Sequence, residues 1–444
     1  MHRKQLIRQA SIVNEDLIRT GDVLVEDGTI AAVCYGEAPP ELRHDADVVE
    51  AAGLYLLPGV IDDQVHFREP GLTHKADIAS ESAAAVAGGV TSFMDMPNTV
   101  PPTTSPERWE EKYRAAEGRS HANYAFYLGA TDSNLPEILR MDWTRSPGVK
   151  VFMGASTGNM LLDDEPHLRQ LFAQCPTLLM THCEDSARIN ARMTEVCSLY
   201  GEDPDVIHHP DLRDEEACTR SSELAVRLAR ESGARLHVAH ISTARELQLF
   251  SPADTRITAE ACVPHLLFDS HDYARLGTRI KCNPAIKQTA DRDALRAALS
   301  DGRISTVSTD HAPHLLTEKA GGCRRAASGM PLVQFSLPAM LTLASQGVLS
   351  MERVVELMCH NQARIFGIAE RGFLREGFRA DIALVRPVEW RVERSNILSL
   401  CGWSPLEGAM LKWRVEHTWV NGIEVWDGRS ISEATRGQAL RFER

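Results

Sequence analysis

The sequence predicts an α/β protein, built as a (β/α)8 TIM-like barrel with a small β-sandwich domain that both chain termini form. Three observations predict it. Strand-like and helical segments alternate through the middle of the chain, strand-and-turn patterns occupy its two ends, and side chains that can bind a metal recur where successive predicted strands end. A doubly wound sheet is the alternative, but it would not explain ligand-type residues at nearly every strand end.

The two ends of the chain predict one discontinuous β domain. Near the start, Asp27-Gly28 forms the turn of a hairpin between residues 22–26 and 29–33. Strand-like segments also occur near the end of the chain, at residues 380–385 and 418–425. Neither end is long enough for a stable sheet alone. We therefore expect the β domain to span residues 1–56 and 366–444, and the barrel to span residues 57–365.

Between these ends the sequence predicts the barrel strands in order. They end near His66, Met96, Leu128, Phe152, His182, His240, Cys262 and Asp310. Predicted helices separate many of them, for example at residues 106–117, 215–232 and 291–299. Because every strand of a parallel barrel delivers its last residue to the same rim, side chains at these ends can converge on one point.

Five side chains at or near the predicted strand ends are candidate metal ligands. Nitrogen and oxygen ligands gathered at one rim suit Zn²⁺ or a similar borderline metal. Taken singly, each has a plainer explanation: a polar cluster that plugs the barrel, a hydrogen-bonded core histidine, or a carboxylate that caps a helix. Their recurrence on strand after strand favours a metal-dependent hydrolase. The five are His66, Lys150, His182, His240 and Asp310.

Two of these side chains carry further chemical expectations. The amine of a buried Lys150 can lose its proton and react with CO₂, which gives an anionic carbamate able to bridge two metals. From the residues alone, a lysine that extends its amine to the strand end is the better explanation. Asp310 can hold a metal through one oxygen and take a proton from water through the other, as a general base.

Polar residues at the first strand ends suggest a substrate with a carboxylate. Arg68 and Asn98 offer a guanidinium fork and an amide, and Asn283 and His314 can add contacts. For the two asparagines, which lie beside prolines, a turn role is a strong alternative. Residues 317–328 follow the last ligand motif and predict a mobile loop over the site.

Composition narrows the class of partner. The net charge of −13 over 444 residues disfavours nucleic acid or an anionic membrane surface, and leaves a small-molecule substrate. The ten cysteines include no CxxC pair, which indicates reduced thiols and a cytoplasmic protein. The N-terminus lacks the apolar core of a signal peptide, and no run of about 18 apolar residues predicts a membrane span.

The motifs resemble those of the dihydroorotases, in the cyclic amidohydrolase group of the amidohydrolase superfamily. The resemblance runs nearly end to end, through residues 65–71, 96–99, 182–185, 240–243, 309–314, 361–367 and 404–408. It implies that the five candidate ligands bind zinc and that Lys150 is the carboxylated, bridging lysine. It also implies that Arg68 and Asn98 clamp the substrate carboxylate, that Asn283 and His314 contact substrate, and that Gly329 supplies a backbone contact.

One departure from that pattern concerns the first strand. Relatives usually carry His-x-His there, whereas this chain has Gln64 followed by His66. An amide oxygen is a poorer zinc ligand than imidazole. Gln64 can ligate weakly, Asp62 can substitute from the same face, or one metal position can be weakened. We expect one firm zinc at Lys150, His182 and His240, and a second of lower affinity beside His66 and Asp310.

The implied activity is the reversible cyclisation of N-carbamoyl-L-aspartate to (S)-dihydroorotate, a step of pyrimidine (UMP) synthesis. A related cyclic amidohydrolase, such as a hydantoinase or an allantoinase, is one alternative. Gln64 motivates another, a non-catalytic dihydroorotase-like subunit that supports a partner enzyme. The resemblance also implies a homo-oligomer, either a dimer or a tetramer.

Overall fold

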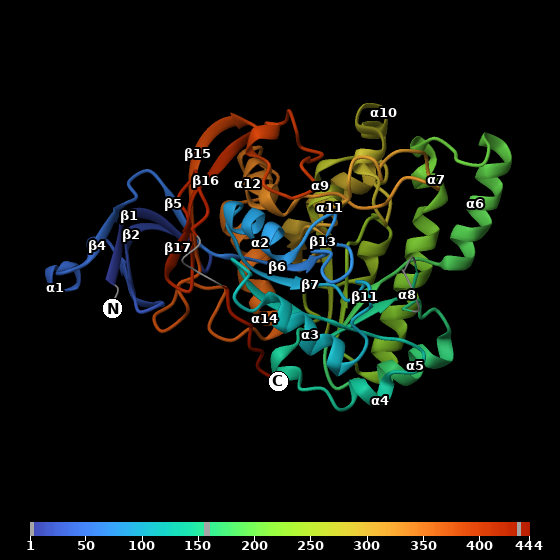
Figure 1. Ribbon diagram of the computed structural model, residues 1–444, viewed down its shortest axis with the longest axis horizontal. Helices are drawn as coiled ribbons and strands as arrows, with labels where there is room; N and C mark the ends of the chain where they lie inside the picture. Colours follow the sequence, from blue (N-terminus) through green and yellow to red (C-terminus); the bar gives the residue numbers. More distant parts are fainter. Residues whose placement is uncertain (1–3, 155–159, 433–436) are drawn as a thin grey trace.

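The computed structural model describes residues 4–154, 160–432 and 437–444. A closed parallel barrel forms its centre, and a mixed β-sheet lies at one end of the molecule (Figure 1). The barrel strands are β6 (Val60–Val65), β7 (Val90–Asp95), β8 (Asn123–Phe126) with its continuation β9 (Leu128–Gly129), β10 (Val149–Phe152), β11 (Leu179–His182), β12 (Leu236–Val238), β13 (Ile257–Cys262) and β14 (Thr306–Ser308). The predicted fold class is confirmed.

Closure of the barrel brings its first and last strands together. β6 pairs with β7 and β13 pairs with β14, all in parallel. The ring closes where Val65 forms a parallel bridge with His311 and the His66 N–H donates to the His311 carbonyl at 2.7 Å. His66 and Asp310, two predicted ligands far apart in sequence, therefore lie just beyond the ends of two adjacent strands, β6 and β14.

Helices surround this barrel. They are α2 (Ile78–Ala87), α3 (Pro106–Ala116), α4 (Leu135–Ile138), α5 (Glu165–Gln174), α6 (Ser186–Tyr200), α7 (His209–Leu212), α8 (Glu215–Ser232), α9 (Val263–Leu267), α10 (Tyr273–Leu276), α11 (Thr289–Asp301), α12 (Ser336–Ser345), α13 (Met351–Val355) and α14 (Asn361–Phe366). The two ends of α8 illustrate how local sequence starts and stops a helix. Asp214 caps its first turn by accepting from the Ala217 N–H, and Gly233 ends it in the left-handed conformation.

Both ends of the chain contribute strands to one eight-stranded sheet. Its members are β1 (Lys4–Asn14), β2 (Leu17–Glu26), β3 (Thr29–Tyr35), β4 (Asp47–Glu50) and β5 (Tyr55–Pro58) from the start, and β15 (Ile382–Arg391), β16 (Met410–Val420) and β17 (Ile423–Trp426) from the end. The short helix α1 (Pro40–Arg43) lies between β3 and β4. β5 and β15 join the two halves in antiparallel register.

The turn chemistry explains the predicted hairpin. Asp27 and Gly28 both adopt positive φ, 47° and 87°, as the tight turn between two twisted antiparallel strands requires. Glu15 and Asp16 do the same between β1 and β2, although neither is a glycine. That hairpin was not predicted because its turn lacks the Gly signal.

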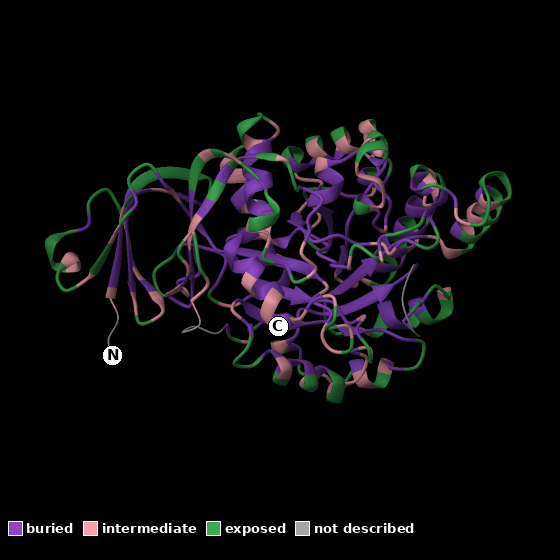
Figure 2. Cartoon of the chain, turned by 45° about the horizontal axis from the view of Figure 1, so that its top comes forward, coloured by how far each residue is buried: buried purple, intermediate pink, exposed green. Residues whose placement is uncertain are grey.

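A continuous buried core joins the barrel to the terminal sheet (Figure 2). It includes Val60 and Val65 from the barrel together with Ala383 and Val415 from the sheet. A separate apolar cluster around Trp419 lies inside the sheet domain. Within the described residues, none of the helices is long and apolar enough to cross a membrane.

Candidate active site

The ends of the barrel strands open into a cavity of about 520 Å³. All of the predicted metal-binding and substrate-binding residues line it. They are His66, Arg68, Asn98, Lys150, His182, His240, Asn283, Asp310, His314 and Gly329. The structure therefore brings the whole predicted set together at one mouth.

Lys150, His182 and His240 form the innermost group. His182 Nδ1 lies 2.9 Å from His240 Nε2, and Lys150 Nζ has no hydrogen-bond partner among the residues that the structure describes, although Lys150 is 1% exposed. Burial lowers the pKa of the Lys150 amine and of both imidazoles, so the neutral forms with free lone pairs are favoured. Two converging imidazole nitrogens beside an unpartnered amine fit a divalent cation, held directly or through a carboxylated lysine.

A carboxylate behind His182 fixes the direction of that imidazole. His182 Nε2 donates to Glu184 Oε2 at 2.9 Å, which leaves Nδ1 directed at His240. Arg213 also donates to Glu184. Burial alone would raise the pKa of Glu184, but Arg213 and His182 hold it at about 2. A carboxylate that orients a histidine in this way is typical of metal sites.

His66, Asp310 and Gln64 form the second group. His66 Nε2 lies 3.0 Å from Asp310 Oδ1, and Gln64 Nε2 donates to the same oxygen at 3.2 Å. His66 Nδ1 lies 2.7 Å from Asn98 Oδ1, so Asn98 holds the ring with Nε2 turned toward Asp310. Gln64 thus contacts the carboxylate as a donor.

Asp62 does not face the cavity. Its carboxylate accepts hydrogen bonds from the Thr309 hydroxyl at 2.6 Å and from the backbone N–H groups of Thr309 and Gln64. Burial raises the pKa of Asp62 to about 7. The suggestion that Asp62 replaces the missing histidine therefore finds no support in the geometry.

Three candidate residues have strained backbones. Arg68, His240 and Asp310 adopt φ of 67°, 38° and 47°, in the left-handed region that residues with a Cβ rarely enter. Each lies just beyond the end of its strand. The turn redirects the side chain from the strand direction into the cavity, which is why strand periodicity alone did not predict where these groups point.

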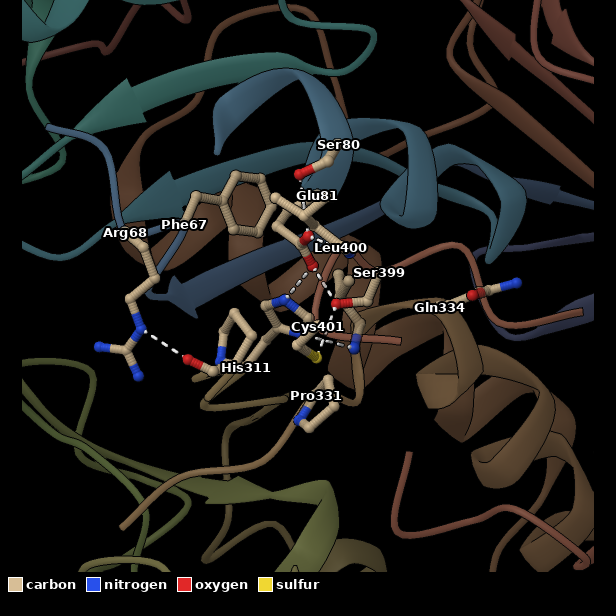
Figure 3. Close-up of polar contacts among 12 residues, drawn as sticks. Phe67, Arg68, Ser80, Glu81, His311, Pro331, Gln334, Ser399, Leu400 and Cys401 are labelled. Atoms are coloured by element: carbon tan, nitrogen blue, oxygen red, sulfur yellow. Dashed lines mark hydrogen bonds and ion pairs between the residues drawn. The ribbon is translucent and has the colours of Figure 1, made fainter. Parts of the chain in front are cut away.

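A buried network holds the segment that carries Asp310 (Figure 3). His311 Nε2 donates to Glu81 of α2 at 2.8 Å, while His311 Nδ1 accepts from the backbone N–H groups of Leu332 and Val333. Glu81 also accepts from the Ser399 hydroxyl at 2.6 Å. His311, the residue after Asp310, is therefore held by α2 and by residues 332–333, and Glu81 links it further to Ser399.

One wall of the cavity is cationic. Arg68 donates through Nε to the Pro313 carbonyl at 3.0 Å, and its terminal nitrogen lies 3.0 Å from His314 Nε2. Lys75 lies 3.2 Å from His314 Nδ1. Burial, with Arg68 and Lys75 nearby, lowers the pKa of His314 to about 2, so the ring is neutral. A guanidinium at this wall suits a carboxylate of the substrate.

Asn283 and Gly329 lie on neighbouring walls. Asn283 Oδ1 lies 3.2 Å from His209 Nε2, and the Gly329 N–H donates to the Lys281 carbonyl at 2.8 Å. Gly329 has φ +129°, and a Cβ there would lie 2.6 Å from the Ala312 carbonyl oxygen. Only glycine fits that place without a shift of the backbone.

A separate polar cluster lies beneath the cavity, inside the barrel. His237 Nε2 is 3.4 Å from Asp63 and 3.9 Å from Glu260, and all three side chains are fully buried. Burial would lower the pKa of His237, but the two carboxylates raise it to about 9. A charged imidazole between two acids accounts for this cluster as an ion-paired floor. The three could also hold a metal by distance.

Several cavity residues were not predicted from the sequence. Phe152, Arg213, Lys281 and Arg324 line the cavity, but no site role was expected of any of the four. Cys323, Arg324 and residues 326–328, which belong to the loop expected over the site, also line the cavity. Hydrogen bonds to Asp203 and Lys319 hold this loop in place, and no local sequence signal marks Asp203, 121 residues before Arg324, as a partner.

The sequence and the fold of this chain are similar to those of known proteins. Residues 55–425 match the amidohydrolase family. The chain is 35% identical to a dihydroorotase of Halobacterium salinarum, over 88% of this chain and 94% of that protein. It is 32% identical to an allantoinase of Bacillus velezensis, over 97% and 96% of the two chains. The solved structure of an L-hydantoinase (dihydropyrimidinase) from Arthrobacter aurescens superposes with a TM-score of 0.92 at 27% identity, covering 99% and 100% of the two chains.

Proposed function

The chain belongs to the amidohydrolase family, and from this premise we propose that it is a dihydroorotase. Its reaction would be the reversible cyclisation of N-carbamoyl-L-aspartate to (S)-dihydroorotate in pyrimidine (UMP) synthesis. The observation that carries the proposal is the cationic wall. Arg68, 8% exposed, lines the cavity beside neutral His314. Dihydroorotate has a carboxylate for it, whereas hydantoin and allantoin have none.

The residues present fit a zinc centre. Lys150, carboxylated on Nζ, would hold the metal with His182 and His240, and His66 and Asp310 would hold a second, weaker ion. Zinc, when bound, supplies Lewis-acid polarisation of the amide carbonyl and a more acidic water. The second position lacks the usual imidazole because residue 64 is a glutamine, whose amide donates to Asp310.

The chain's own groups supply positioning and proton transfer. Arg68 and His314 would fix the carboxylate end of the ring, so that the scissile amide lies toward Asp310. Asp310 would accept the proton of the attacking water and deliver it to the leaving ring nitrogen. In the cyclisation direction the same carboxylate would take the proton from the ureido nitrogen.

A matched pair of variants tests the substrate. Wild type, Arg68→Met and Arg68→Lys are assayed with dihydroorotate, hydantoin and allantoin. We expect turnover of dihydroorotate, a kcat/KM lowered about a hundredfold by Arg68→Met, and a smaller loss in Arg68→Lys, which keeps the charge but not the fork. Preferred turnover of hydantoin or allantoin, unaffected by Arg68→Met, would contradict the proposal.

The second candidate is a hydantoinase or an allantoinase, which the similarity to such enzymes favours. The same assay separates it from the first. A non-catalytic subunit, which Gln64 suggests, would show no turnover of any of the three compounds by the pure chain. We further propose that the protein is cytoplasmic and forms a homo-oligomer, a dimer or a tetramer. Sedimentation of the purified protein would test the oligomeric state.

A further inference from the structure

Lys319 is a buried lysine with an unusual set of partners. It is 2% exposed, and its ammonium donates to the backbone carbonyls of Lys281, Ala327 and Gly329 at 3.0, 2.7 and 2.7 Å. No ion pair to a carboxylate joins it in the part of the chain that the structure describes. An ammonium has three N–H donors, and here each has a carbonyl.

These carbonyls belong to two walls of the cavity. Lys281 lies two residues before Asn283, and Ala327 and Gly329 lie beyond β14 on the other wall. The Gly329 N–H donates to the same Lys281 carbonyl at 2.8 Å. Lys319 therefore joins the wall of Asn283 to the wall of Gly329 from behind.

The contact with Ala327 sets the direction of the next N–H group. The C=O and N–H of a trans peptide point in opposite directions. Since the Ala327 carbonyl turns to Lys319, the Ser328 N–H turns the other way, and Ser328 lines the cavity. Among the described residues, the Ser328 N–H makes no backbone hydrogen bond, whereas its neighbours Ala327 and Gly329 each make one.

We propose that Lys319 is a positioning residue that orients the Ala327–Ser328 peptide so that the Ser328 N–H donates to an oxygen of the bound substrate. This inference rests on the proposed function, because it takes the cavity as the site of a cyclic amide. The Ser328 carbonyl is held as well, since it accepts from His314 Nε2 at 3.0 Å. The peptide planes on both sides of Ser328 are therefore fixed, one by Lys319 from behind the cavity wall and one by His314 within it.

Variants of Lys319 and Ser328 separate this role from a purely structural one. Lys319→Met removes the donors and keeps most of the stem, and Ser328→Pro removes the proposed N–H itself. Both are expected to raise KM for dihydroorotate about tenfold, with kcat changed less than about threefold and zinc content unchanged.

Arg325→Met is the matched control for charge in the same loop. Arg325 is 71% exposed, lies 3.9 Å from Asp203 and does not line the cavity, so its loss should leave KM unchanged. An unchanged KM in both Lys319→Met and Ser328→Pro, with the proteins folded and loaded, would overturn the inference.

Hydrogen exchange of the amides at residues 326–330 tests the positioning by Lys319 independently of activity. Faster exchange in folded Lys319→Met than in Arg325→Met supports the proposal that Lys319 holds this segment, and equal exchange overturns it. Should wild type hydrolyse none of the three cyclic amides, the dihydroorotase proposal would fail, while the exchange comparison would still decide what Lys319 holds. If Lys319→Met does not fold, the KM of Ser328→Pro decides the substrate contact.

Discussion

At the scale of single residues, the candidate ligands differ in how well they are supported by their surroundings. His182 has a carboxylate behind it, whereas His66 is held by the neutral amide of Asn98. A carboxylate partner raises the basicity of an imidazole ligand. The group of Lys150, His182 and His240 is therefore the better oriented of the two for a metal. That it holds the firmer zinc stays a prediction.

Restoring the missing imidazole should strengthen the second metal position. Gln64→His would place a ring nitrogen near Asp310 in place of an amide donor, so we expect the bound metal to rise toward two zinc ions per chain. Metal analysis after dialysis against a weak chelator measures this. Gln64→Ala, which removes the amide without adding a ligand, should not show the gain. Two tightly held ions in wild type, unaffected by Gln64→His, would contradict the prediction.

The sequence predicted the candidate residues better than the groups that support them. Ligand types at strand ends are a local signal, so His66, Lys150 and Asp310 could be found from their neighbours in sequence. Arg213 and Lys319 act through hydrogen bonds to residues far along the chain, and nothing local marks them. That the Lys150 amine has no hydrogen-bond partner among the described residues likewise became evident only in the structure.

At the scale of elements, helix α2 reaches the site through Glu81. This fully buried carboxylate accepts from His311, Ser399 and Leu400, so it holds the residue next to Asp310 (Figure 3). Glu81→Gln would turn an amide N–H₂ toward at least one of these donors. We expect kcat to fall about tenfold with KM little changed, and a loss of unfolding free energy of about 1–3 kcal/mol.

Steady-state kinetics and thermal unfolding of Glu81→Gln test this role. Glu111→Gln on α3 makes the same chemical change at an exposed ion pair with Arg108, so it should alter neither property. A Glu81→Gln enzyme with the kcat and melting temperature of wild type would show that the network does not position Asp310.

The loop over the cavity depends on Asp203. Its carboxylate accepts from the backbone N–H groups of Gly322, Arg324 and Arg325 at 2.8, 2.9 and 3.1 Å. Burial would raise the pKa of Asp203, but these N–H groups lower it. The stabilisation is therefore present above the unfolded-state pKa and is lost as pH falls through the lowered folded-state value.

Melting temperatures measured from neutral pH down to about pH 3 test that linkage. Asp203→Asn should lower the melting temperature at neutral pH and flatten its decline in acid, because the variant has no carboxylate to protonate. Asp301→Asn, at an exposed pair with Arg303, is the control. An acid decline of equal steepness in wild type and Asp203→Asn would contradict the assignment.

At the scale of the whole molecule, the barrel fixes where chemistry occurs and the terminal sheet completes the core. The fold class could be predicted because alternation and strand-end residues are periodic signals. The boundaries of the β domain at residues 56 and 366 stay a prediction. The structure places β5 and β15 side by side, and this pairing of segments more than 300 residues apart is a property of tertiary packing that no local pattern specifies.

Because the apolar core runs through both parts, we expect one cooperative unfolding transition. Trp419, fully buried in the sheet domain, is a direct probe. Trp419→Ala should cost about 3–5 kcal/mol of unfolding free energy and leave the KM of the folded enzyme unchanged. Calorimetry, and denaturant unfolding monitored by the release of bound metal, test this prediction. A second transition, in which the site survives loss of the sheet, would contradict the prediction.

The most direct test is a crystal structure of the purified protein with anomalous scattering at the zinc edge. We predict a strong zinc peak about 2.0–2.1 Å from both His182 Nδ1 and His240 Nε2, with density for a carboxylate beyond Lys150 Nζ. A weaker peak is expected beside His66 and Asp310. A cavity without metal in protein purified with zinc, or a zinc peak only among Asp63, His237 and Glu260, would contradict the account.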